Sequence, residues 1–282
     1  MNHDVTLPSD TRSPIFIGGQ RRSGTTLMRV LLNRHPHIAC GPESHFASRF
    51  ERWHKQLADE WSETVRRYGF GPEAVDRAFA AIADNLFTRY QLAEGKRRWA
   101  DKTPANILRI DYLFRLFPRA QFVHVIRDPR DTYCSIRHKA HTSKPDWVRF
   151  TPPYAARDWR ASILAGERWR AYPDRYHEVR YEELVRAPEA TLRRVLAFLN
   201  EPWDPRVLDP DADNSEARRP ELKKRDRIFA TSIGRWRTEL NGAEVAEIES
   251  IAGELMVELG YPVAAAGERA TSALTAANAG RG

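Results

Sequence analysis

The stretch that decides the fold reads IFIGGQRRSGTTLMR and occupies residues 15–29. Its first three apolar residues predict a short buried strand, and the apolar residues from Leu27 onward predict a helix. Between them lies a loop with the G-x-x-x-x-G spacing of phosphate-binding loops, in which backbone N–H groups and the helix N-terminus face an anion. Ser23, Thr25 and Thr26 add hydroxyl donors. We therefore expect a phosphate site at the end of the first strand.

This loop differs from that of nucleoside triphosphatases at one position. In those proteins the second glycine is followed by the lysine that reaches the β- and γ-phosphates, whereas here Gly24 is followed by Thr25. The loop therefore favours an anion other than a triphosphate. A plain turn that only joins strand to helix is the alternative, and the correct flanking elements argue against it.

A second polar motif, RDPRDTYCS, directly follows the apolar run FVHVI at residues 122–126. A near-continuous apolar run predicts a strand buried on both faces of a parallel sheet. Asp128 and Pro129 suit the first turn of a helix, which lets Arg127 and Ser135 face one crevice. An arginine and a hydroxyl that converge favour a second anion site. The alternative is a helix start closed by an ion pair between Arg127 and Asp128.

Strand-like and helix-like segments alternate along the rest of the chain. Further short strands are expected at 97–100 and 177–181, and a loop at 201–227. The alternation predicts an α/β fold: a three-layer α/β/α sandwich like that of P-loop proteins, with a central parallel sheet and helical insertions. Its ligand sites should lie at the carboxyl ends of the strands. Helices are expected over 27–34, about 47–90, 104–117, 154–171, 192–199 and 245–259, with one more beginning near Pro129.

The composition excludes several classes of protein. With 282 residues, of which 41% are hydrophobic and 10% aromatic, the chain has ample material for a large core and is not fibrous or disordered. A net charge of +7 suits nucleic acid, a membrane surface or a small anionic ligand equally well. Two cysteines, Cys40 and Cys134, exclude a disulfide framework and a cysteine-built zinc site and indicate a reducing compartment. We interpret His35 and His37 as a capping and packing pair rather than metal ligands.

The two ends of the sequence predict little structure. Residues 1–13 lack the pattern of a secretion signal, and no later stretch reaches the roughly 18 apolar residues of a membrane span. Residues 264–282 are rich in Ala, Gly, Thr and Ser, which predicts a disordered tail. We expect one domain over 14–263, with the helical segment at 47–95 as an insertion, and a cytoplasmic protein without a membrane anchor.

Several motifs, taken in order, resemble the sulfotransferases that use 3′-phosphoadenosine 5′-phosphosulfate (PAPS). They are the phosphate loop, Arg127 with Ser135, and the late IGRW at 233–236, and the resemblance spans about 14–261. The tyrosylprotein sulfotransferase branch and its bacterial relatives are the most similar. That finer resemblance rests on GG at 18–19, TTLMR at 25–29, HP at 35–36 and CG-x-E at 40–43.

The resemblance implies how the donor would be bound, with PAPS as co-substrate, 3′,5′-adenosine bisphosphate (PAP) as product and no metal. Arg127 and Ser135 would hold the 3′-phosphate. Tyr181 and the segment 228–235, including Ser232 and Arg235, would cover the nucleotide. The 5′-phosphosulfate would be held by Arg22, Ser23, Gly24, Thr25 and Thr26.

The resemblance also implies the catalytic groups. Glu43 matches the glutamate that is the general base in the tyrosylprotein branch. Cytosolic small-molecule sulfotransferases instead read Lys-Thr-His with the histidine as base, whereas residues 102–104 read Lys-Thr-Pro, and proline accepts no proton. Lys102 and Arg22 would offset the charge that develops during transfer. His45 is a weaker substitute as the base, and a surface carboxylate is the plain alternative for Glu43.

The acceptor stays open at this stage, as do two other functions. An alcohol or phenol is expected, carried by a small molecule, carbohydrate, lipid or peptide. Aromatic residues at 44–97 and 138–153, such as Trp53, Trp61, Trp147 and Phe150, suit an acceptor site or a helical cap equally. A P-loop kinase would use Asp128 to position magnesium. A nucleic-acid-binding protein would use the basic cluster at 223–227, although no recognition helix or aromatic RNA platform accompanies it. The sequence does not indicate an oligomeric state.

Overall fold

The computed structural model describes residues 13–60, 62–142, 146, 149–210 and 230–263. Several features singled out in the sequence lie outside these ranges. They are residues 1–12 of the segment 1–13 that is predicted to be disordered, the predicted disordered tail at 264–282, Trp61, Trp147, the basic cluster at 223–227 and residues 228–229.

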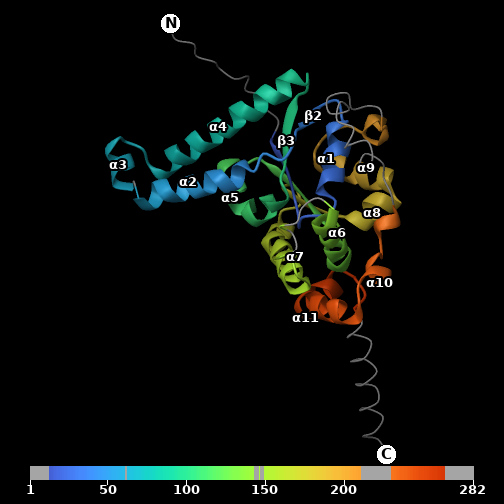
Figure 1. The fold of residues 1–282 in the computed structure, drawn as a ribbon. Helices are drawn as coiled ribbons and strands as arrows, with labels where there is room; N and C mark the ends of the chain where they lie inside the picture. Colours follow the sequence, from blue (N-terminus) through green and yellow to red (C-terminus); the bar gives the residue numbers. More distant parts are fainter. Residues whose placement is uncertain (1–12, 61, 143–145, 147–148, 211–229, 264–282) are drawn as a thin grey trace, which may run out of the picture.

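Five parallel strands form the central sheet in the order β2-β3-β1-β4-β5. Figure 1 labels the neighbouring strands β2 and β3 at one side of this sheet. Because all five run the same way, their carboxyl ends meet at one edge, and both polar motifs follow that edge. The predicted α/β fold with a parallel sheet is confirmed. The strand β2 was not predicted, because three residues are too short to show a pattern. The strands are β1 (Ile15–Gly18), β2 (Ile38–Cys40), β3 (Arg98–Lys102), β4 (Gln121–Ile126) and β5 (Tyr176–Arg180).

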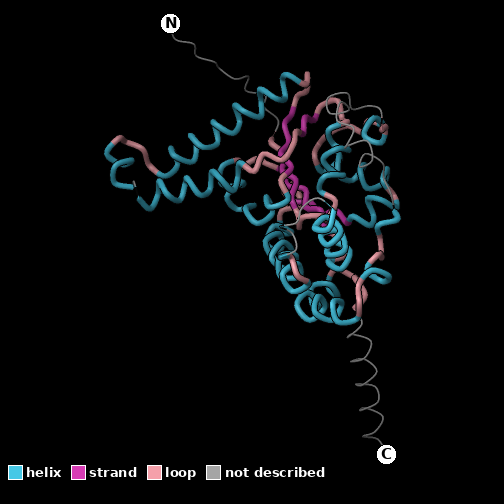
Figure 2. Tube along the Cα trace, in the orientation of Figure 1, coloured by secondary structure: helices cyan, strands magenta, loops and turns pink. Residues whose placement is uncertain are grey.

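Helices connect the strands and cover both faces of the sheet (Figures 1 and 2). The predicted segments at 104–117 and 154–171 each contain a 3₁₀ turn in addition to an α-helix. The helices are α1 (Thr25–Asn33), α2 (Phe46–Glu60), α3 (Ser62–Arg67), α4 (Pro72–Ala93), α5 (Ile110–Leu116), α6 (Pro129–Thr142), α7 (Pro152–Glu167), α8 (Tyr181–Arg186), α9 (Pro188–Phe198), α10 (Trp236–Glu239) and α11 (Gly242–Glu258). The 3₁₀ turns are η1 (Pro104–Arg109), η3 (Arg168–Ala171), η4 (Pro205–Leu208) and η5 (Ala230–Ser232).

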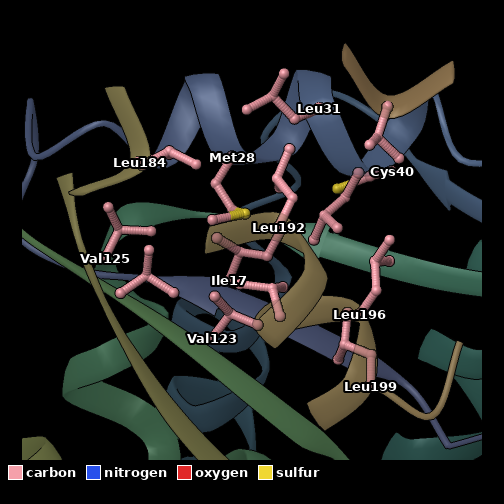
Figure 3. Packing of buried hydrophobic residues seen from close by; sticks show 14 of the residues in the cluster. Ile17, Met28, Leu31, Cys40, Val123, Val125, Leu184, Leu192, Leu196 and Leu199 are labelled. Carbon is pink, nitrogen blue, oxygen red and sulfur yellow. The ribbon is translucent and has the colours of Figure 1, made fainter. Parts of the chain in front are cut away.

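The central strand β1 divides the core into two layers. Ile15 and Ile17 point to one face, where they join a cluster with α1, α8 and α9. Phe16 points to the other face, where it packs with α5 and the base of α2. Figure 3 shows the first cluster, in which Met28 of α1 and Leu192 of α9 meet strand residues. This alternation of side chains gives the sheet a buried layer on each side, as a three-layer fold requires.

The helices α2 and α4 form an arm that projects from the body, with α3 at its tip (Figure 1). The arm corresponds to the helical segment predicted at about 47–95. Its base is anchored by aromatic packing, including Phe87 stacked on Trp99 with ring centroids 4.7 Å apart. Farther out it exposes apolar side chains, including Trp53, Ile82 and Leu86. Among the described helices, none combines the length and the apolar character needed to cross a bilayer.

Candidate active site

Two glycines shape the phosphate loop between β1 and α1. Gly19 adopts φ +149°, and a Cβ there would lie 2.3 Å from the carbonyl oxygen of Val125. Gly24 adopts φ +108°, and its Cβ would lie 2.4 Å from the ring of Tyr181. Neither position therefore accommodates a side chain without displacing its neighbour. The close approach of backbone and ring is what lets the loop curl at the end of the sheet.

The structure brings the two predicted anion motifs together. Arg22 lies in the left-handed region at φ +71°, and its Nε donates to Ser135 Oγ at 3.0 Å. Arg127 donates to the carbonyl oxygen of Arg22 at 3.3 Å and to that of Ser232 at 2.5 Å. Its guanidinium lies 4.5 Å from the centre of the Tyr181 ring. Residues that are up to 210 positions apart in the chain, from 22 to 232, thus form one basic pocket.

Two buried polar atoms of these two motifs have no hydrogen-bond partner among the described residues. They are Ser23 Oγ and Arg127 Nε. Leaving a buried donor unpaired is costly, and such groups call for a ligand or water. A hydroxyl in the phosphate loop and an arginine at the end of β4 suit an anion with two separate phosphate-type groups.

The acidic residues of the second motif have structural partners. Both carboxylate oxygens of Asp128 accept hydrogen bonds from Arg130, at 2.7 to 3.0 Å. Asp131 accepts from the backbone N–H groups of Gly234 at 2.7 Å and Trp236 at 3.1 Å. Burial raises the pKa of Asp131, and these two N–H donors oppose the shift. Asp131 therefore ties the segment that carries Ser232 to the start of α6.

On the other side of the loop, Glu43 and Lys102 form an ion pair. Lys102 Nζ lies 2.5 Å from Glu43 Oε1 and 3.2 Å from Thr26 Oγ1, so the ammonium bridges the carboxylate and the phosphate loop. The Lys102 side chain is only 3% exposed, whereas Glu43 is 37% exposed. Burial lowers the pKa of Lys102, and the Glu43 carboxylate opposes that shift. A carboxylate open to solvent next to a buried cation is an arrangement that can accept a proton from a bound ligand.

The turn that carries Glu43 is held from the neighbouring strand β3. The buried carboxylate of Asp101 accepts a hydrogen bond from Ser44 Oγ at 2.7 Å. The N–H of His45 donates to Thr103 Oγ1 at 3.2 Å, and His45 adopts φ +56°. Its Nε2 lies 3.6 Å from Glu43 Oε2, which is beyond hydrogen-bond distance. Glu43 is thus placed by a fixed turn, and His45 lies beside it.

These groups surround a cavity of about 650 Å³ at the carboxyl edge of the sheet. One part is lined by the basic pocket and the other by Glu43, His45 and η1. Several lining residues were not singled out as site residues from the sequence, among them Ala105, Ile107, Leu108, Asp158 and Ser162. The only local signal was the spacing of Asp158 and Ser162, one helical turn apart on α7, which places both on one face.

The sequence pattern of the sulfotransferase family matches residues 14–205. The chain belongs to the sulfotransferase family. The resemblance found in the motifs is therefore confirmed, and the α/β fold is the one that this family's solved members show.

Curated relatives of this sulfotransferase chain include two from distant sources. It is 30% identical over 260 residues to the protein-tyrosine sulfotransferase of Drosophila melanogaster, covering 88% of this chain and 51% of that protein. It is 29% identical over 279 residues to the nodulation protein NoeE of Sinorhizobium fredii, covering 87% of this chain and 65% of that protein. The chain thus spans about half the length of the Drosophila relative.

Solved structures share the fold at lower identity. The sulfotransferase domain of the Synechococcus PCC 7002 olefin synthase aligns with a TM-score of 0.61 and 23% identity, covering 88% of this chain and 96% of that one. Mouse sulfotransferase SULT7A1, in complex with PAP, aligns with a TM-score of 0.51 and 14% identity, covering 87% of this chain and 85% of that one.

One predicted site residue of this sulfotransferase lies away from the cavity. The Nε of Arg235 is 2.7 Å from Glu239 Oε1, one turn along α10, and Arg235 is not among the residues that line the cavity. The other predicted residues line the cavity or contact residues that line it. They are Arg22, Ser23, Gly24, Thr25, Thr26, Glu43, Lys102, Arg127, Ser135, Tyr181 and Ser232. In the late IGRW motif, Asp131 holds the backbone N–H groups of Gly234 and Trp236.

The two histidines after α1 join a buried polar cluster. Ligand atoms of His35, His37 and Glu201 lie within 4.8 Å of one another. However, His35 Nδ1 accepts the N–H of His37 at 3.2 Å, and its Nε2 lies 2.9 Å from the carbonyl oxygen of Pro202. His37 Nδ1 lies 2.9 Å from Glu201 Oε2. Because both nitrogens of His35 are used, the geometry favours a packing role that pins residues 201–202 to the start of β2.

Proposed function

We propose that this chain transfers a sulfuryl group from PAPS to a hydroxyl group of an acceptor. The observation that supports this most directly is the joined pair of anion sites, in which Arg22 contacts both Ser135 and Arg127. The unpaired donors Ser23 Oγ and Arg127 Nε fit a ligand with a phosphate-type group at each end. A family member of the same fold, mouse SULT7A1, is described in complex with PAP.

In this proposal the basic pocket binds the donor. The loop residues Ser23 to Thr26 and the N-terminus of α1 hold the 5′-phosphosulfate, because N–H and O–H donors converge there. Arg127 and Ser135 hold the 3′-phosphate. Tyr181, whose OH lies 2.7 Å from Ser232 Oγ, covers the nucleotide together with η5. Arg235 would contribute only through the backbone of its segment.

Glu43 is proposed as the general base. The acceptor oxygen forms a bond to sulfur while the bond between sulfur and the phosphate oxygen breaks, and PAP leaves with that electron pair. A phenol titrates near ~10 and a glutamate near ~4.3, so full removal of the proton before attack is uphill by several kcal/mol. The proton therefore moves to Glu43 as the new bond forms. Glu43 Oε2 is the oxygen available for this, since Oε1 faces Lys102.

Lys102 and Arg22 are proposed to offset negative charge during the transfer. Lys102 already bridges Glu43 and Thr26, which places its ammonium between the base and the phosphate loop. Preorganised cations at the position where charge develops stabilise the transition state without further rearrangement. The chain's own residues thus supply a base and two cations, and no step requires a metal ion.

Residues 14–263 are proposed to act as one catalytic domain, with the α2–α4 arm on the acceptor side. The helix α2 begins at Phe46, directly after Glu43 to His45, so the arm starts where the base is. A kinase-like use of Asp128 is less well supported, because Arg130 occupies both oxygens of its carboxylate.

Calorimetry without magnesium tests the donor site first. The affinities for PAP, 5′-AMP and ATP are compared, and PAP is expected to bind at least about tenfold more tightly than either, because only PAP engages both anion sites. Equal affinities would contradict the proposal. Magnesium-dependent binding of ATP would favour the kinase alternative instead.

A further inference from the structure

One wall of the cavity presents hydrogen-bond acceptors that the donor site does not use. Asp158 and Ser162 come from one face of α7, and Gln20 comes from the start of the phosphate loop. The turn η1 packs against α7 and supplies Ile107 and Leu108 to the same cavity. A ligand beside Glu43 would therefore meet an apolar surface and this polar wall.

The hydrogen-bond direction at Ser162 follows from a chain of buried groups. Tyr176 OH donates to Glu178 Oε1 at 2.9 Å, so its oxygen accepts from His124 Nδ1 at 2.6 Å. Burial lowers the pKa of His124 to about 3, so the ring is neutral and its Nε2 carries no proton. That nitrogen, 3.2 Å from Ser162 Oγ, therefore accepts a hydrogen bond that the Ser162 hydroxyl donates. Ser162 therefore offers only lone pairs to the cavity.

The surrounding structure preserves this chain. Gly166 lies one turn after Ser162 on α7, and a Cβ there would lie 2.0 Å from Tyr176 OH and 3.1 Å from His124 Nδ1. Glu178 is the last group in this series of hydrogen bonds, and Arg170 Nε lies 2.9 Å from its Oε1. Because each member has one partner on each side, the acceptor character of Ser162 is built into the fold.

Gln20 supplies a second acceptor. Its Nε2 donates to the carbonyl oxygen of Ala155 at 2.7 Å, which fixes the orientation of the amide. Its Oε1 is buried and has no hydrogen-bond partner among the described residues, although Gln20 lines the cavity. Gln20 is only 4% exposed, so bulk water does not readily donate a hydrogen bond to this oxygen. A ligand donor would do so.

Asp158 supplies the charged acceptor. Its Oδ2 lies 3.8 Å from Arg21 Nε, which is too long for a hydrogen bond, while the Arg21 guanidinium lies 4.4 Å from the centre of the Phe150 ring. Burial raises the pKa of Asp158, and Arg21 and Gln20 oppose the shift. The nearby guanidinium already balances the charge of the carboxylate. A neutral group that donates hydrogen bonds therefore fits better than a second cation.

We infer that the acceptor is a polyol, whose additional hydroxyl groups, adjacent to the one that is sulfated, donate to Asp158, Gln20 Oε1 and Ser162. This inference rests on the proposed function and names the substrate class of that same site. The carbon face of such a molecule packs on Ile107 and Leu108. A simple alcohol lacks the second donor and leaves the wall unsatisfied, which weakens its binding.

Binding to the PAP-loaded protein tests the inference with three probes of one ring size. They are cyclohexanol, cis-1,2-cyclohexanediol and trans-2-aminocyclohexanol, titrated by NMR. The diol is expected to bind about tenfold more tightly than the other two. In Asp158→Asn the preference for the diol over cyclohexanol should fall to about twofold or less. Ser162→Ala should reduce it by about threefold, because one neutral acceptor is lost.

Glu167→Gln is the matched control, since it makes the same chemical change at an exposed position near the end of α7. It should keep the full preference. The affinity for PAP, measured first, should stay within about twofold in all variants, which shows that the donor site is intact.

Three results would overturn the inference. Equal binding of diol and cyclohexanol to the wild type would show that the wall does not recognise a second hydroxyl. Tightest binding of the amine would show that Asp158 binds a cation. An unchanged preference in Asp158→Asn would remove that residue from recognition. If PAP itself fails to bind, the proposed function fails, which is a separate result.

Discussion

The proposed donor half and the proposed acceptor half of the cavity differ in how their side chains are held. In the donor half, arginine, serine and tyrosine side chains contact one another directly, as in the pairs Arg22 with Ser135 and Tyr181 with Ser232. In the acceptor half, Glu43 is partly open to solvent, and the wall formed by Gln20, Asp158 and Ser162 includes Gln20 Oε1, which has no hydrogen-bond partner among the described residues. The side chains of the first half thus hold one another in place, whereas those of the second half are fixed from outside the cavity and would select a ligand by its shape and its hydroxyl groups.

This difference explains why the family is easier to identify than the substrate. Most of the donor half comes from two short contiguous motifs, each of which follows a strand, and Tyr181 and Ser232 complete it from α8 and η5. The wall opposite is assembled from α7, η1 and Gln20, and no single contiguous motif marks it. A common donor needs a constant pocket, while different acceptors need different walls.

The largest expected effect is on the rate of sulfuryl transfer, measured separately from the affinity for the donor product PAP. Glu43→Gln should lower kcat by about 10³, because a general base contributes on the order of 10² to 10⁴ in rate. Its affinity for PAP should change by less than about twofold, since the amide keeps the shape of the side chain. Glu73→Gln, at a carboxylate that is 92% exposed on α4, is the control and should keep full activity. An active Glu43→Gln would transfer the role of base to another group, with His45 the next to test.

A somewhat smaller effect is expected in the donor half. Arg127→Ala should weaken PAP binding by about 10², because it removes a buried cation from the 3′-phosphate site. Binding of 5′-AMP should weaken much less. Arg119→Ala removes an exposed arginine and should leave both affinities unchanged. Equal losses for PAP and 5′-AMP in Arg127→Ala would show that Arg127 does not recognise the 3′-phosphate.

The acceptor wall should show a pH dependence of stability through His124. Its pKa is lowered by burial to about 3 in the folded chain, against 6.5 when exposed. As the pH falls below 6.5, the unfolded chain takes up this proton first, so stability present at neutral pH is lost. Between about pH 7.5 and about pH 5, His124 should account for about 2 kcal/mol of the lost unfolding free energy.

Urea unfolding at both pH values, in the wild type and in His124→Gln, isolates that contribution. The variant should lose about 2 kcal/mol less than the wild type over this range, whatever its stability at neutral pH. An identical pH dependence would mean that His124 is not held neutral, and the direction assigned to the Ser162 hydroxyl would then be wrong.

The smallest effect is expected on the outer surface of the arm. Trp53 is 59% exposed, so Trp53→Ala should lower the unfolding free energy by less than about 1 kcal/mol and leave PAP binding unchanged. Phe79→Ala on the same arm is the contrast, since Phe79 is 7% exposed and its loss should cost about 3 kcal/mol. A change in PAP affinity in Trp53→Ala would show that the arm and the donor half are coupled.

The sequence predicted the sheet, and it singled out most residues of the basic pocket, because both leave local patterns. Apolar runs mark β1 and β4, and the glycines and arginines that follow them mark the loop and the second motif. It could not predict β2, whose three residues carry no period, or α8, which follows β5 without a break. The partner of Arg235 and the acceptor wall depend on contacts between distant segments, which local patterns do not encode.

The arm has a further consequence for how members of this family diverge. It leaves the sheet after β2 and returns at β3, and these two strands are paired neighbours, with Ile38 opposite Arg98. Its two attachment points therefore stay fixed whatever the length of the helices between them, and lengthening such an excursion carries only a small entropic cost. The arm can therefore be exchanged as one unit. Replacing the segment between 46 and 93 with that of a relative would change the surroundings of Glu43 and leave the order of the strands intact.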